Sequence, residues 1–151
     1  MHFTLHFFGD LPDECVQFLY HIFEEDMSLV RPPIPARLGL PGKFPEKGPP
    51  RVLWVGLEEG RDELKDYWQM FESKLIPMHL DPDPRGFQPH LTVARTGHAT
   101  VDRGWVDHIQ VPRMDFIISE CVLYQSILCQ GGGAYLPLKR VAFEEGERES
   151  R

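Results

Sequence analysis

The stretch His2-Phe3-Thr4-Leu5-His6-Phe7-Phe8-Gly9 opens the chain, and the interpretation of the whole sequence starts from it. Apolar residues alternate in it with His2, Thr4 and His6. This alternation predicts a strand with one face in a core and polar side chains on the other face. His2 and Thr4 are therefore expected to lie on the same face.

The opening pattern returns at residue 90. His90-Leu91-Thr92-Val93 again places a histidine and a threonine at alternate positions of a strand-like run, and a glycine follows seven residues after the histidine in both copies. We interpret the two copies as an internal repeat, which predicts two similar lobes related by a pseudo-twofold axis. A third match, His98-Ala99-Thr100, lacks the alternating strand, and Thr100 is better explained as a helix cap.

The remaining segments predict an α+β fold of antiparallel sheets with helices on the outside. A first helix is expected with Asp10 as its N-cap and apolar residues at helical spacing as far as Met27. Further expected elements are a hairpin of 37–40 with 52–57, a helix with its apolar stripe at Leu64, Tyr67, Trp68, Phe71 and Leu75, a short helix at 101–109, turns at 81–86 and 131–133, and strands at 114–128 and 135–140. The whole chain, 1–151, is expected to form one two-lobed domain with a disordered tail at 144–151.

Composition narrows the function classes. The net charge of −7 argues against a protein that coats nucleic acid with a broad basic surface, so any recognition of RNA should be local. Apolar runs fall short of the roughly 20 residues that span a bilayer, which predicts no membrane partner. The three cysteines are odd in number and lack metal-ligand spacing, so we expect a cytoplasmic protein.

Several motifs together resemble the 2H phosphoesterase superfamily, in particular its RNA 2′,3′-cyclic phosphodiesterases, also called 2′-5′ RNA ligases. The resemblance covers nearly the whole chain. It rests on the two His-x-Thr copies, Gly42-Lys43-Phe44-Pro45, Arg51-Val52-Leu53-Trp54-Val55-Gly56, Phe87-Gln88-Pro89 before His90, Leu123-Tyr124-Gln125-Ser126-Ile127-Leu128 and Tyr135-Leu136-Pro137-Leu138. It implies an active-site cleft between two lobes, with His2 as general acid and His90 as general base, and with Thr4 and Thr92 as donors to phosphate oxygens.

The chemistry of these residue types agrees with those roles. Opening a cyclic phosphodiester requires removal of a proton from water and delivery of a proton to the departing ribose oxygen. Two imidazoles with ordinary pKa values near 6.5 can serve as base and acid. Threonine hydroxyls can donate to the non-bridging oxygens, so neither a metal nor a cofactor is expected.

Three further residues are candidates with weaker support. Arg95 matches a family arginine and has a fork suited to phosphate, but strand parity points it away from His90 unless the strand is bulged. His6 shares the face of His2, and Lys43 lies in a loop; both are candidates for RNA contact, with a solvated position as the alternative. Tyr124 and Tyr135 are expected in the core more than on a nucleobase.

The start of the chain departs from the resembled family, whose members usually have a strand and a helix before the first His-x-Thr. We therefore expect this first strand and helix to be missing from the chain. An exposed strand edge at His2 would follow, with a possible dimer through it, but no obligatory protein partner.

Four functions remain open. The first is hydrolysis of RNA 2′,3′-cyclic phosphate ends to 2′-phosphates, with reversible 2′-5′ ligation as a further possibility. The second is a phosphodiesterase for small cyclic nucleotides, and the third is a non-catalytic module that binds RNA ends. The fourth is a metal hydrolase with His2, His6 and His90 as ligands.

Overall fold

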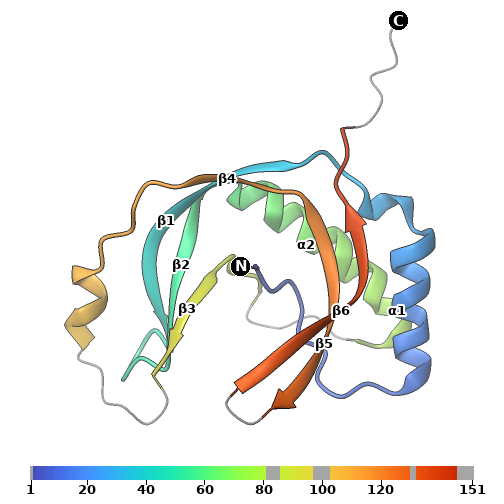
Figure 1. The fold of residues 1–151 in the computed structure, drawn as a ribbon, viewed down its shortest axis with the longest axis horizontal. Helices are drawn as coiled ribbons and strands as arrows, with labels where there is room; N and C mark the ends of the chain where they lie inside the picture. The colour runs from blue at the N-terminus through green and yellow to red at the C-terminus, as the bar shows by residue number, and fades with distance from the viewer. Residues whose placement is uncertain (1, 81–85, 97–102, 130–131, 146–151) are drawn as a thin grey trace, which may run out of the picture. The chain divides into compact units, whose positions relative to one another are not determined.

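The computed structural model describes residues 2–80, 86–96, 103–129 and 132–145. Its architecture is α+β with antiparallel sheets, as the sequence predicts (Figure 1). The chain divides into two compact units, one made of Met1–Phe7 and Pro35–Ile117, the other of Phe8–Ile34 and Ile118–Arg151. We call them unit 1 and unit 2. No helix in the described residues is long and apolar enough to cross a membrane.

Unit 1 contains a four-stranded sheet and one long helix. The strand order is β3 (Leu91–Arg95), β2 (Val52–Glu59), β1 (Ile34–Phe44) and β4 (Asp115–Ile118). Helix α2 (Arg61–Leu75) contacts β2, and the short 3₁₀ turns η2 (Ile76–Met78) and η3 (Arg103–His108) complete the unit. The β1–β2 hairpin confirms the predicted one, although β1 is longer than expected.

Unit 2 combines helix α1 (Asp13–Glu25), the 3₁₀ turn η1 (Met27–Leu29) and a hairpin of β5 (Glu120–Cys129) with β6 (Gly132–Ala142). Helix α1 contacts β6, and the Lys139 ammonium binds the Glu24 carboxylate and lies over the Tyr20 ring. The paired strands confirm that 114–128 and 135–140 are largely extended. Gly132 and Gly133, predicted as part of a turn at 131–133, instead pair with β5 as the start of β6, and residue 131 lies outside the described residues.

The second helix shows why apolar periodicity predicts packing well. Leu64, Tyr67, Phe71 and Leu75 are all buried, as a stripe at spacings of three and four residues requires. The first helix is less well predicted. Pro12, in an extended conformation, is its N-cap in place of Asp10, and Met27 lies beyond the helix and is 75% exposed.

The prediction of an opening strand is wrong. Residues 2–9 form neither helix nor strand, and Phe7, expected on the core side, is 79% exposed. A strand needs a hydrogen-bonded neighbour, and these residues have no place in either sheet order of the described chain. The exposed strand edge expected at His2 is therefore not formed.

The lobes do not follow the halves of the repeat. Met1–Phe7, with the first His-x-Thr, belongs to the same unit as His90, and the chain changes unit after Phe7, after Ile34 and after Ile117. The sheets also differ, with four strands in one unit and two in the other among the described residues. Where the structure describes it, the expected helix over 101–109 is the 3₁₀ turn Arg103–His108. Residues 97–102, and residues 81–85 of the turn expected at 81–86, lie outside the described residues.

Candidate active site

His90 lies immediately before β3 and is held from two sides. Its Nδ1 is 2.7 Å from the Gln88 carbonyl oxygen. Because a carbonyl oxygen only accepts, Nδ1 carries the proton and Nε2 of the neutral ring keeps its lone pair. The ring also packs edge-on against Phe44, with centroids 5.0 Å apart, and lies 6.1 Å from the ring of Trp54. This arrangement fixes the tautomer and orientation that a general base requires.

A bulge in β3 determines which side chains share the face of His90. Trp54 of β2 is paired with Thr92, but Leu53 is paired with Ala94, so Val93 is the extra residue. Val52 is then opposite Arg95. Since Val52 and Trp54 alternate onto the same face, Thr92 and Arg95 also share it. The bulge therefore supplies the change of parity that a phosphate role for Arg95 needs. Val93, the extra residue, is 65% exposed.

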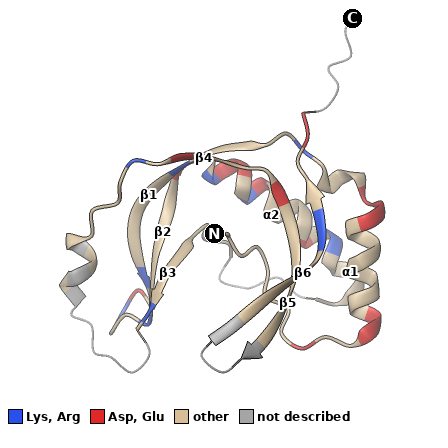
Figure 2. Ribbon diagram, in the orientation of Figure 1, with Lys and Arg blue, Asp and Glu red and all other residues tan. Residues whose placement is uncertain are grey.

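Basic residues gather at the end of the sheet where β1 and β2 are joined and β3 ends (Figure 2). Arg51 and Arg95 are exposed there. Lys43 lies in β1, not in the loop where it was expected. It is half-buried, and its ammonium group is within hydrogen-bond distance of three carbonyl oxygens of the loop that follows the strand, those of Pro45, Glu46 and Gly48. This geometry favours a role for Lys43 in holding the loop; contact with RNA stays a prediction.

His2 and Thr4 are both exposed and belong to the same unit as His90. Partial burial of the His2 ring, and after it the positive charge of the amino terminus, lower the pKa of His2 from its ordinary 6.5. The charged form that a general acid must supply is thus disfavoured in this chain.

We expect the imidazole of His2 to titrate below pH 6.5 in an NMR pH series. Acetylating the amino terminus should raise the midpoint because it removes the positive charge. The midpoint should nevertheless stay below 6.5, since burial is the larger cause. A midpoint at or above 6.5 in the unmodified chain would contradict the expected environment of His2.

His6 lies against helix α2. Its Nδ1 is 2.7 Å from Oε1 of Glu72, and the two side chains are 11% and 7% exposed. The sequence analysis predicted contact with RNA, solvent or a metal ion for His6, and it did not predict the contact with Glu72. The signal was available, because Glu72 follows Trp68 by one helical turn and thus lies beside the apolar stripe.

No group of three His, Cys, Asp or Glu side chains among the described residues is arranged to hold a metal ion. His2, His6 and His90 therefore do not form the ligand trio of the fourth hypothesis in this structure. His6 instead has its ring nitrogen on a carboxylate.

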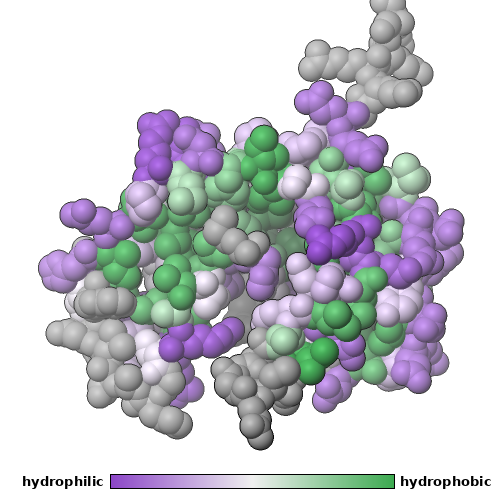
Figure 3. Space-filling model, in the orientation of Figure 1, coloured by the Kyte–Doolittle hydropathy of each residue, from purple (hydrophilic) through white to green (hydrophobic). Residues whose placement is uncertain are grey.

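Tyr124 and Tyr135 of unit 2 are not in the core. They are 37% and 54% exposed, and their rings meet edge to face with centroids 6.0 Å apart. Ile127 and Leu136 of the same hairpin are also largely exposed, and apolar side chains are visible over it in Figure 3. The expectation that the tyrosines pack inside is wrong.

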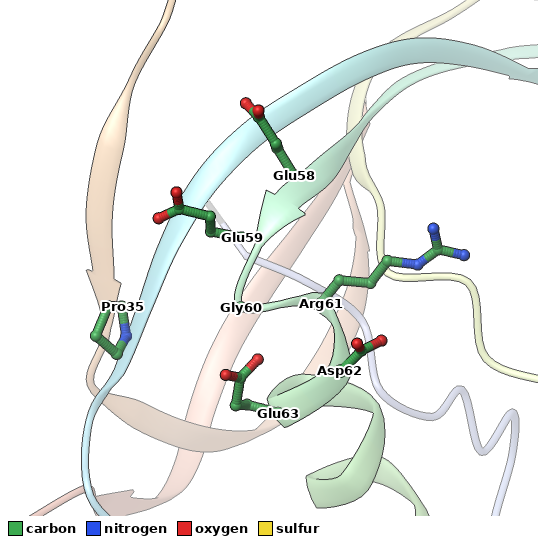
Figure 4. A pocket seen from close by; sticks show the side chains of 7 residues that line it. All are labelled: Pro35, Glu58, Glu59, Gly60, Arg61, Asp62 and Glu63. Atoms are coloured by element: carbon green, nitrogen blue, oxygen red, sulfur yellow. The ribbon is translucent and has the colours of Figure 1, made fainter.

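A hollow of about 600 Å³ lies in unit 1 where β2 leads into α2. Figure 4 shows its lining, in which Arg61 extends away from Pro35 and Glu59. The carboxylates that line it belong to Glu58, Glu59, Asp62 and Glu63. Such a surface repels a polyanion, so it does not compete with the His90 face as a phosphate site.

The chain is similar in sequence to known RNA 2′,3′-cyclic phosphodiesterases. The chain is 30% identical over 146 residues to an RNA 2′,3′-cyclic phosphodiesterase of Aeropyrum pernix, covering 93% of this chain and 80% of the relative. A relative of the same description from Methanothermobacter thermautotrophicus is 27% identical, with 92% and 76% covered. No protein-family model matches the chain.

Solved structures share the fold. The protein TT0787 of Thermus thermophilus superimposes with a TM-score of 0.76 at 23% identity, covering 95% of this chain and 78% of that one. Escherichia coli LigT complexed with 3′-AMP gives a TM-score of 0.73 at 24% identity, with 95% and 77% covered.

Proposed function

The chain belongs to the RNA 2′,3′-cyclic phosphodiesterase family, and from this premise we propose that it opens cyclic phosphates at RNA ends with His90 as general base and His2 as general acid. The observation that carries the proposal is the environment of His90. Its Nδ1–H is engaged by a carbonyl oxygen, its ring is fixed by two aromatic side chains, and Thr92 and Arg95 lie on the same face of the sheet.

The proposed reaction is a displacement at phosphorus with two proton transfers. Nε2 of His90 takes a proton from water as the water oxygen bonds to phosphorus. The bond from phosphorus to the ribose O3′ breaks, and His2 gives O3′ a proton, so the product has a 2′-phosphate and a free 3′-hydroxyl. When the 5′-hydroxyl of a second RNA replaces water, the same transfers give a 2′-5′ linkage. Ligation therefore requires no further residue.

The neighbouring polar groups have separate tasks in this proposal. Thr4 and Thr92 donate hydrogen bonds to the non-bridging oxygens, on which charge accumulates as the new bond forms. Arg95 neutralises the phosphate with its planar guanidinium group. The basic end of the sheet, with Arg51 exposed, attracts the RNA backbone locally although the chain as a whole is acidic.

We expect the chain to convert an oligonucleotide with a 2′,3′-cyclic phosphate into a product with only a 2′-phosphate. The phosphate position is read by mass spectrometry combined with phosphatase and alkali treatment. A 2′,3′-cyclic mononucleotide serves as the second substrate and should react more slowly, because it lacks the backbone that the basic strand ends contact. A 3′-phosphate product, or loss of activity after exhaustive chelation, would overturn the proposed mechanism.

A further inference from the structure

The segment that carries His2 and Thr4 is not part of a sheet in the described chain. Residues 2–9 are outside both sheets, so no strand ladder determines where these two side chains lie. The segment is attached to unit 1 by side chains. The Phe3 ring stacks on Phe116 of β4 with centroids 6.1 Å apart, and His6 binds Glu72 of α2.

The His6 contact is chemically specific. The carboxylate oxygen accepts from Nδ1–H at 2.7 Å, and both side chains are nearly buried. Glu72 is the buried charged residue of the described core, and its second oxygen, Oε2, is buried without a hydrogen-bond partner. Burying a carboxylate with a hydrogen bond to only one of its oxygens costs free energy of desolvation. An apolar side chain of similar size often gives at least the same stability.

The side chains of the segment do not alternate regularly between exposed and buried positions. Along the segment His2 and Thr4 are exposed, yet His6 turns inward and Phe7 turns outward. The alternation of the sequence is thus broken at the residue that meets Glu72. Directed hydrogen bonding, unlike apolar packing, fixes both the position and the orientation of the backbone that carries it.

We propose that the buried His6–Glu72 contact is a latch that positions His2 and Thr4 for the reaction. His6 and Glu72 are positioning residues that act through His2. The inference rests on the proposed function for its catalytic consequence, whereas the placement of His2 can be measured without substrate. The substitutions described below separate an effect on stability from an effect on the position of His2.

The test compares His6→Leu, Glu72→Ala and the double variant His6→Leu/Glu72→Met with the unmodified chain. Each should lower kcat on the cyclic-phosphate oligonucleotide by about 10- to 100-fold with a much smaller change in KM, because misplacement by about 1 Å has that effect on rate. The double variant should be as stable to urea as the unmodified chain, since two apolar side chains replace the buried pair. His6→Lys, which keeps an N–H donor for Glu72, should restore most of kcat.

The readout that needs no turnover is the NMR titration of His2. Release of the segment should remove the partial burial that lowers the pKa of the His2 ring, so the midpoint should rise toward 6.5 in the latch variants and stay lowered in His6→Lys. Asp66→Ala, which removes an exposed carboxylate of the same helix, is the matched control and should change neither quantity. Glu72→Met keeps the approximate size of the side chain without an oxygen that could accept from His6, and it replaces Glu72→Ala if the latter does not fold.

The possible outcomes distinguish a failure of the latch from a failure of the proposed function. Unchanged kcat and an unchanged His2 titration in the latch variants would overturn the latch. A shifted His2 titration in a chain that does not open cyclic phosphates would support the latch as a structural device and reject the proposed function.

Discussion

His90→Ala is expected to lower kcat/KM on a cyclic-phosphate oligonucleotide by about 10²- to 10⁴-fold, the usual contribution of a positioned acid or base. In the unmodified chain the Gln88 carbonyl and two aromatic rings hold the His90 ring in place. A water molecule in the space left by the side chain would not be held in this way, so it cannot replace Nε2 as the proton acceptor. His2→Ala should cause a loss of the same order. The double variant should be little worse than either single variant, since both groups act in one step.

The measurement is single-turnover kinetics with enzyme in excess, which separates chemistry from product release. Thr4→Ala and Thr92→Ala are compared with the two histidine variants. Each removes one donor to a charged oxygen, worth about 1.5–3 kcal/mol, so a measurable residue of activity should remain. Full activity in either histidine variant would reject the two-histidine mechanism.

The predictable part of this fold is the part governed by local periodicity. The stripe of α2 and the pairing of β1 with β2 follow from apolar spacing, and both occur as predicted. The helix start at Pro12 shows the limit of cap signals, since a proline with extended ψ can occupy the N-cap position that Asp10 was expected to fill.

The parts that could not be predicted depend on partners distant in sequence. An alternating pattern at 2–7 favours a strand, but a strand forms only where another strand has an unpaired edge in register. Glu72 appears in sequence as one more helix carboxylate, and only its meeting with His6, 66 positions away, gives it a role. The bulge at Val93 could not be predicted either, because it exists only through the pairing of β3 with β2.

The aromatic support of His90 leads to the second large effect. The indole of Trp54 lies across Gly42, its cross-strand partner, and packs on Phe44 with centroids 5.2 Å apart. A Cβ added at Gly42 would come within 2.6 Å of Cε2 of this indole and closer still to two more of its carbons. The indole also packs against the rings of Phe44 and His90, so it cannot move aside without disturbing them. A methyl group at position 42 must therefore displace the support of His90.

Gly42→Ala is therefore expected to reduce the free energy of unfolding by about 1–3 kcal/mol, as overpacking does, and to lower kcat by about 10- to 100-fold through misplacement of the base. Gly39→Ala, on the same strand as Gly42, is the matched control, because the atoms nearest to its added Cβ belong to the backbone of Leu57 and Glu58, with the closest at 2.8 Å, and not to Trp54. It should lose stability but keep kcat per folded molecule. Urea unfolding, single-turnover kinetics and the ring-current shift of the His90 proton resonances measure these three effects. Normal kcat and an unshifted His90 resonance in Gly42→Ala would show that Trp54 does not position the base.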